Sequence, residues 1–176
     1  PLLPEAHHNL AVSLAEGGSF TVAIAHWRKA IDLNPSYVDA HHGYGLALIF
    51  VGQTGAGIAE MKRALERDPK RVDTRALLAW TLATHAKVEI RDPAAALELA
   101  RRACELSPQP DAKLLDTLAA AEAATGLFAE AAQTAAAAVA AAGESPLAES
   151  MRARQKLYEA GKPYIQGAAA AVGGRP

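Results

Sequence analysis

Mostly apolar residues, together with His7 and His41, recur along this chain at the spacing of one helix face. Positions 7, 10, 11 and 14 follow the i, i+3, i+4, i+7 pattern, and positions 41, 44, 45 and 48 follow it again. Residues 20–31 carry a wider apolar stripe at the same period. The sequence has no runs in which apolar and polar residues alternate, the pattern that indicates strands. We therefore predict an all-α protein.

The helical pattern itself repeats. The run Glu-Ala-His-His at 5–8 returns as Asp-Ala-His-His at 39–42, a distance of 34 residues. A fixed period of this length is typical of arrays of helix-turn-helix repeats. Proline disfavours the α conformation of the residue before it, so prolines mark the ends of the helix pairs. These prolines are Pro35, Pro69 and Pro108.

The repeated segments resemble the tetratricopeptide repeat (TPR). Residues 7–35 align with residues 41–69, with Gly18 over Gly52. The resemblance implies a right-handed α-α superhelix, a TPR solenoid with a small residue at the eighth and twentieth position of each repeat. Those small residues are Ala11, Gly45, Ala79 and Ala119, and Ala23, Gly57, Ala96 and Ala131.

The resemblance also sets the predicted domain organisation. A TPR array fills residues 1–160, and a flexible tail rich in alanine and glycine follows at 161–176. The third repeat has a longer loop, after which Asp92 is expected to cap the next helix. Because a solenoid must cover the apolar surface of its last repeat, we expect a capping helix at the end. The predicted repeats are 4–37, 38–71, 72–108 and 112–143, with the capping helix at 146–160.

Charge and composition exclude several classes of function. The 18 basic and 19 acidic residues give a net charge of -1, so the chain shows no excess of positive charge for binding nucleic acid. No apolar run approaches the ~18 residues that span a bilayer, and we expect a soluble protein of the cytoplasm or periplasm without membrane insertion. The chain opens on Pro1 without a methionine. We therefore expect a processed protein or a piece of a longer one.

Paired acidic and histidine residues raise the question of a metal site. Glu5, His8, Asp39 and His42 share one face in the predicted register, and such pairs occur in the metal sites of helical bundles. Those sites take further carboxylates from facing helices, whereas Val12 and other apolar residues lie beside this set. We predict no cofactor and no native metal site, with these four residues as the candidates if one exists.

No motif for catalysis appears in the sequence. Residues 52–57 have the glycines of a phosphate loop but lack the Lys-Ser/Thr that follows them in that motif. Cys104 is the single cysteine, and its place on an apolar stripe suggests a small buried hydrophobe. His26 and His85 are expected on the surface. We predict that the chain is not an enzyme.

The second face of the first helices lines the concave groove in tetratricopeptide arrays. Apolar residues in the middle of this predicted groove and acidic residues and histidines at its rim suggest a site for a peptide or helix. The known carboxylate clamp and asparagine ladder of the family are not matched here. The predicted groove residues are Glu5, His8, Val12, Asp39, His42, Leu46, Ile49, Phe50, Asp73 and Trp80.

Three hypotheses for function follow. The first is a non-catalytic protein-protein interaction module or scaffold subunit that binds a protein or peptide partner in the groove. The second is the TPR arm of a larger bacterial membrane protein, such as a glycosyltransferase. The third is metal or cofactor binding through His8 and His42. Association into a homo-oligomer or a larger complex is open. The apolar groove is either open or covered by a neighbouring repeat or by a part of the chain that would precede Pro1.

Overall fold

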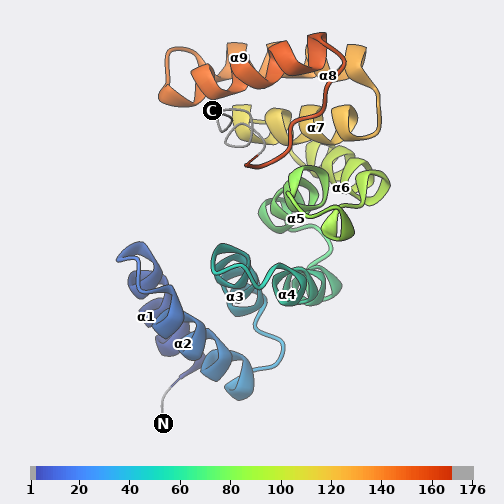
Figure 1. Ribbon diagram of the computed structural model, residues 1–176. Helices are drawn as coiled ribbons and strands as arrows, with labels where there is room; N and C mark the ends of the chain where they lie inside the picture. Colours follow the sequence, from blue (N-terminus) through green and yellow to red (C-terminus); the bar gives the residue numbers. More distant parts are fainter. Residues whose placement is uncertain (1–2, 168–176) are drawn as a thin grey trace, which may run out of the picture. The chain divides into compact units, whose positions relative to one another are not determined.

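The computed structural model describes residues 3–167, and its regular elements in that range are all helices. Four helix pairs follow one another and a further helix closes the series (Figure 1). The predicted all-α fold of four repeats and a capping helix is confirmed. Within this range no helix is both long and apolar enough to cross a bilayer. The α-helices are α1 Pro4–Glu16, α2 Phe20–Leu33, α3 Val38–Phe50, α4 Thr54–Arg67, α5 Val72–Thr84, α6 Pro93–Leu106, α7 Ala112–Ala124, α8 Phe128–Ala142 and α9 Pro146–Glu159.

The chain divides into two compact units, Pro1–Thr74 and Arg75–Pro176. In the first, called the N-terminal unit, α1 packs on α2, α2 on α3 and α3 on α4. In the second, the C-terminal unit, α6 packs on α7, α7 on α8 and α8 on α9. Most of α5 belongs to this second unit, where the Leu82 carbonyl accepts a hydrogen bond from the Asp92 N–H at 3.1 Å.

Small residues allow the two helices of a repeat to approach closely. Between α3 and α4 the contact is backbone on backbone, because a Cβ atom added to Gly57 would lie 2.6 Å from the carbonyl oxygen of Gly45. The predicted small positions of all four repeats are buried, as the repeat pattern requires. They are Ala11, Ala23, Gly45, Gly57, Ala79, Ala96, Ala119 and Ala131.

Glycine closes the turn inside a repeat. Gly18 and Gly52 adopt φ values of 79° and 83°, in the left-handed region that other residues rarely enter. The next N–H then reaches back to a carbonyl five residues earlier, as in Ser19 to Leu14 at 2.7 Å. The third repeat instead has the predicted longer loop, with a short 3₁₀ helix η1, Val88–Ile90. The Asp92 side chain caps α6 by accepting the Ala95 N–H at 3.1 Å, as predicted.

The chain continues past α9 in an extended conformation. Residues 162–165 have no helical structure, and Gly161 and Gly167 on either side have φ values of 67° and 77°. In Figure 1 this segment runs back from the end of α9 past α7. The Gln166 N–H donates to the Thr84 carbonyl at the end of α5 at 2.8 Å. The remainder of the predicted tail, from residue 168 on, lies outside the described residues.

Candidate functional site

A pocket of about 340 Å³ opens on the N-terminal unit, between α1 and α3. Its walls are mostly apolar, and its polar side chains lie toward both helix N-termini and the loop before α5, except Glu16 at the end of α1. Many of the predicted groove residues of this unit therefore come together in one place. The lining residues are His8, Val12, Ala15, Glu16, Trp27, Asp39, His42, Gly43, Leu46 and Arg71.

The indole of Trp27 forms the base of this pocket and is held by a glycine. A Cβ atom added to Gly43 would lie 2.6 Å from Cε2 of Trp27, so only glycine lets the buried indole approach α3 this closely. The indole Nε1–H donates to Nδ1 of His8 at 3.3 Å. This hydrogen bond ties α2 to α1 and fixes Nδ1 of His8 as an acceptor. The Nδ1 side of the His8 ring thus faces Trp27.

Arg71 organises the charged end of the pocket. Its guanidinium donates to the carboxylate of Asp39 on α3 and, from Nε at 2.8 Å, to Oδ1 of Asp73 on α5. Partial burial pushes the pKa of Asp73 up, but the hydrogen bonds from Arg71 and the charge of His42 outweigh it and hold that pKa below its ordinary value. The guanidinium joins the two carboxylates in an ion-pair network between repeats, and this network keeps a net negative charge.

His42 lies beside this network. Its Nδ1 is hydrogen-bonded to the Thr74 hydroxyl at 2.8 Å, and its Nε2 lies 3.9 Å from Oδ2 of Asp73. Burial lowers the pKa of His42, although the Asp73 carboxylate opposes the shift. Burial lowers the pKa of His8 in the same way, opposed by Asp39. Both imidazoles are therefore favoured in their neutral form at the pocket.

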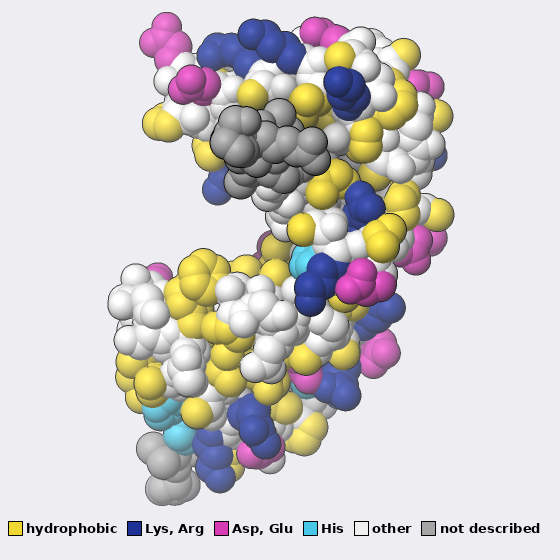
Figure 2. Space-filling view, in the orientation of Figure 1, with side chains coloured by type: hydrophobic (Ala, Val, Ile, Leu, Met, Phe, Trp, Pro, Cys, Tyr) yellow, Lys and Arg dark blue, Asp and Glu magenta, His cyan; other side chains and the backbone are white. Residues whose placement is uncertain are grey.

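Apolar side chains continue from the pocket to the end of α3. Leu46 is 43 % exposed and Phe50 is 67 % exposed, and the Phe50 ring stacks on Phe20 at a centroid distance of 3.8 Å. Figure 2 shows hydrophobic side chains gathered over this part of the N-terminal unit. Ile49 instead contacts α4, since its Cγ1 would lie 2.7 Å from a Cβ atom added to Gly57. The accessible apolar surface is thus formed by Leu46 and Phe50.

The remaining predicted groove residues are placed differently. Glu5 is exposed on the first turn of α1, and Asp73 is engaged by Arg71. Trp80 belongs to the C-terminal unit, where it is half-buried against Tyr164 at a centroid distance of 5.8 Å. Its aromatic face is therefore covered within that unit by the segment that follows α9.

No group of three or more histidine, cysteine, aspartate or glutamate side chains in residues 3–167 is placed to hold a metal ion. Of the four candidates, His8 accepts from Trp27, Asp39 accepts from Arg71, and His42 bonds to Thr74. Each of these three side chains has a partner within the repeat framework.

The other histidines belong mainly to the packing between helices. His7 and His41 are buried, in agreement with the helix phase read from the sequence. His26, expected on the surface, is partly exposed, and its Nδ1 lies 3.0 Å from Nδ1 of His7. The returning histidines of the sequence therefore mark equivalent positions of two repeats.

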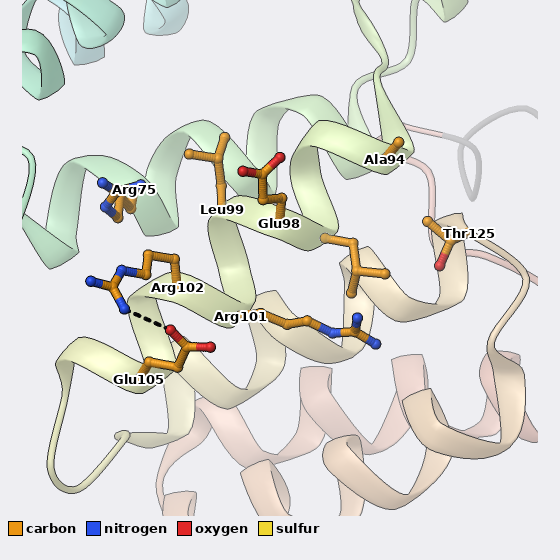
Figure 3. A pocket seen from close by; sticks show the side chains of 9 residues that line it. Arg75, Ala94, Glu98, Leu99, Arg101, Arg102, Glu105 and Thr125 are labelled. Atoms are coloured by element: carbon orange, nitrogen blue, oxygen red, sulfur yellow. Dashed lines mark hydrogen bonds and ion pairs between the residues drawn. The ribbon is translucent and has the colours of Figure 1, made fainter.

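A second, larger pocket lies on the C-terminal unit. Long charged side chains of α6 surround it, with Arg75 on α5 (Figure 3). Arg102 donates to the Glu105 carboxylate at 2.8 Å, and both side chains are more than half exposed. Charges of both signs line this pocket and solvent reaches them, so it has the character of a solvated surface. Its volume is about 650 Å³.

Comparisons with known proteins agree with this arrangement. A family model described as TPR repeat matches residues 13–49, and one described as Tetratricopeptide repeat matches residues 38–71. Residues 13–71 are therefore tetratricopeptide repeats. Helix pairs continue beyond those residues, with the longer loop inside the third pair. A search of curated protein sequences finds no match to it.

Solved structures of other TPR proteins share the fold. PilW, a widely conserved type IV pilus biogenesis factor, superposes with a TM-score of 0.77 at 17 % identity, over 90 % of this chain and 70 % of that one. PilF of Pseudomonas aeruginosa gives 0.74 at 18 %, over 89 % and 68 %. YrrB, a TPR protein with an unusual peptide-binding site, gives 0.69 at 22 %, over 89 % and 77 %. At these identities the likeness concerns the fold alone.

Several residues at the site were missed by sequence reasoning. Arg71 lies in the loop before α5, outside the helix register from which the groove positions were read. Trp27 was assigned to a packing stripe, and its edge reaches the pocket only because Gly43 lacks a side chain. The one sequence signal that could have indicated Arg71 is its basic side chain two residues before Asp73.

Proposed function

We propose that the chain is a non-catalytic interaction module, and that the pocket between α1 and α3 binds a peptide or helix of a partner protein. TPR folds are typically non-catalytic and bind proteins, and YrrB is described as having a peptide-binding site. The observation that carries the proposal is the exposed Leu46 and Phe50 at the end of a pocket with polar groups at its other end. An apolar surface with a polar rim is characteristic of interaction sites.

Charge indicates the kind of partner. The Arg71 guanidinium is already engaged by Asp39 and Asp73, so it offers little to a carboxylate ligand. Glu16 lines the pocket and Glu5 lies on the first turn of α1, and both carboxylates are exposed. A segment with apolar anchors and Lys or Arg beside them complements this surface. We therefore propose a partner segment that is amphipathic and basic.

A displayed library of random peptides tests this proposal. Peptides are selected on the immobilised chain and then compared by fluorescence anisotropy on Leu46→Asp and on Val22→Asp, the matched control on an exposed position of α2. We expect selected peptides to carry apolar residues with Lys or Arg, to bind Val22→Asp like the wild type, and to lose at least tenfold in affinity on Leu46→Asp. Peptides that bind Leu46→Asp unchanged, or a library that yields none, would refute the proposal.

A further inference from the structure

The C-terminal unit has a second surface of interest, formed by the positions of α5 and α7 that correspond to the groove of the first unit. Trp80 and Thr84 lie on α5, Asp116 and Ala124 on α7, and Arg154 of α9 reaches over them. The chain itself covers this surface with residues Lys162–Gln166. We call these five residues the C-terminal segment.

The C-terminal segment contacts the surface in the manner of a bound peptide. Its Tyr164 ring lies 5.8 Å from Trp80, and the Arg154 guanidinium lies 5.4 Å from the centroid of each ring. Its Gln166 N–H donates to the carbonyl of Thr84, in the last turn of α5, where carbonyls lack a helical partner.

Arg154 is held in place independently of the C-terminal segment. Its Nε donates to Oδ1 of Asp116 at 2.8 Å and its Nη2 donates to Oδ2 at 2.7 Å. This two-bond pairing fixes the guanidinium plane, and both side chains are nearly buried. The site for an aromatic ring between Trp80 and Arg154 therefore stays formed when Tyr164 is removed.

The C-terminal segment fills this site incompletely. An open pocket of about 290 Å³ remains beside Pro163 and Ile165, and Lys162 and Pro163 are exposed. Well-packed interiors leave few voids larger than a water molecule. Gly161 and Gly167, both with positive φ, bracket the segment and supply points at which the backbone can turn. The remaining walls of this pocket are Ala83, Val88, Arg91, Pro93 and Ala124.

We propose that this surface is a second peptide-binding site, occupied in the free protein by the C-terminal segment. The external ligand is an extended partner segment with an aromatic residue followed by a large aliphatic residue, which takes the places of Tyr164 and Ile165. Because the C-terminal segment is tethered, it competes at an effective concentration on the order of millimolar. The apparent affinity for the partner is reduced by the fraction of molecules in which the site is covered.

Peptide binding to the intact chain tests the proposal. The probe is a fluorescein-labelled peptide with the sequence of residues 161–167, capped at both ends, and anisotropy is measured on the wild type, Tyr164→Ala and Tyr164→Ala/Trp80→Ala. We expect Tyr164→Ala to bind the probe at least tenfold more tightly than the wild type, and the double variant to lose that gain. A probe in which Tyr is replaced by Ser serves as the matched control and should not bind.

Other outcomes overturn the proposal. Equal binding to the wild type and Tyr164→Ala would mean that the segment does not cover the site. No binding to any variant up to millimolar probe, with a lowered melting temperature for Tyr164→Ala, would make the segment a structural strap. A wild-type dimer that Tyr164→Ala abolishes would assign the site to a second copy. Should Tyr164→Ala fail to fold, Gln166→Pro removes the N–H that bonds to Thr84 and must increase probe binding.

Discussion

The imidazole of His41 joins the two helices of the second repeat, with Nδ1 at 2.7 Å from Oε2 of Glu60. On its other side, Nε2 lies 3.0 Å from the carbonyl of Pro35, which can only accept a hydrogen bond. The Nε2 atom therefore donates to this carbonyl, and both ring nitrogens have a hydrogen-bond partner. Both residues are buried, so this pair closes a polar network inside the repeat core.

Loss of the Glu60 carboxylate should destabilise the fold. Glu60→Ala leaves the Nδ1 of His41 without its partner in a buried place, at a cost of about 1–3 kcal/mol in the free energy of unfolding. Glu66→Ala, an exposed position of the same helix, should change that free energy by less than about 0.5 kcal/mol. Urea unfolding of the two variants measures the difference, and equal values would contradict the role of the network.

Close contact between α3 and α4 predicts opposite effects for two glycines of α4. Gly57→Ala places a Cβ atom 2.6 Å from the Gly45 carbonyl, and forcing the helices apart should cost about 1–3 kcal/mol. A Cβ atom at Gly55 meets nothing within 4 Å, so Gly55→Ala should stabilise the helix by up to about 1 kcal/mol. Thermal melts followed by circular dichroism distinguish the two; a stabilising Gly57→Ala would rule out the tight approach.

The buried pair of Asp116 and Arg154 should be much more sensitive than the surface charges of α9. Arg154→Leu leaves the Asp116 carboxylate buried without its partner, which costs about 3–5 kcal/mol. Arg152→Leu, exposed on the same helix, should stay within about 0.5 kcal/mol of the wild type. Chemical unfolding is the measurement. In the double variant Asp116→Leu/Arg154→Leu much of the loss should be recovered, and strict additivity would argue against a coupled pair.

Neutral histidines at the pocket predict a loss of stability on mild acidification. Burial lowers the pKa of His8 and of His42 from 6.5 in the folded protein, so below about pH 6.5 the unfolded chain binds protons first. The free energy of unfolding should therefore fall as the pH drops from 7.5 to 5.5. In His8→Gln/His42→Gln this fall should be smaller.

The effect of the histidines is the difference in the free energy of unfolding between the variant and the wild type at each pH. Burial raises the pKa of Asp116 and of Glu122, and these carboxyls favour the fold on acidification, which opposes the histidine effect. Asp73, whose pKa is lowered, contributes stability that is lost only at more acidic pH. Urea unfolding at pH 7.5, 6.5 and 5.5 provides the data; identical pH profiles for the two proteins would exclude the histidines as the cause.

The sequence by itself determined the helices, their pairing and the small residues where they cross. These features depend on local periodicity and on positions 34 residues apart, both of which can be read along the chain. It also placed His8, Val12, Asp39, His42 and Leu46 on one face. Their convergence in one pocket confirms the helix register without establishing a ligand.

Only the tertiary structure decided which groove positions are accessible. Ile49 packs toward Gly57, and Trp80 lies under Tyr164, a contact between residues 84 positions apart that no helical period encodes. Arg71 reaches Asp39 from a loop, where side-chain direction does not follow a repeating angle. Repeat patterns specify how neighbouring helices pack, because equivalent positions make the same helix–helix contacts in every repeat. Loops and chain ends make contacts that do not recur from repeat to repeat. These contacts depend on the path of the backbone in the folded protein.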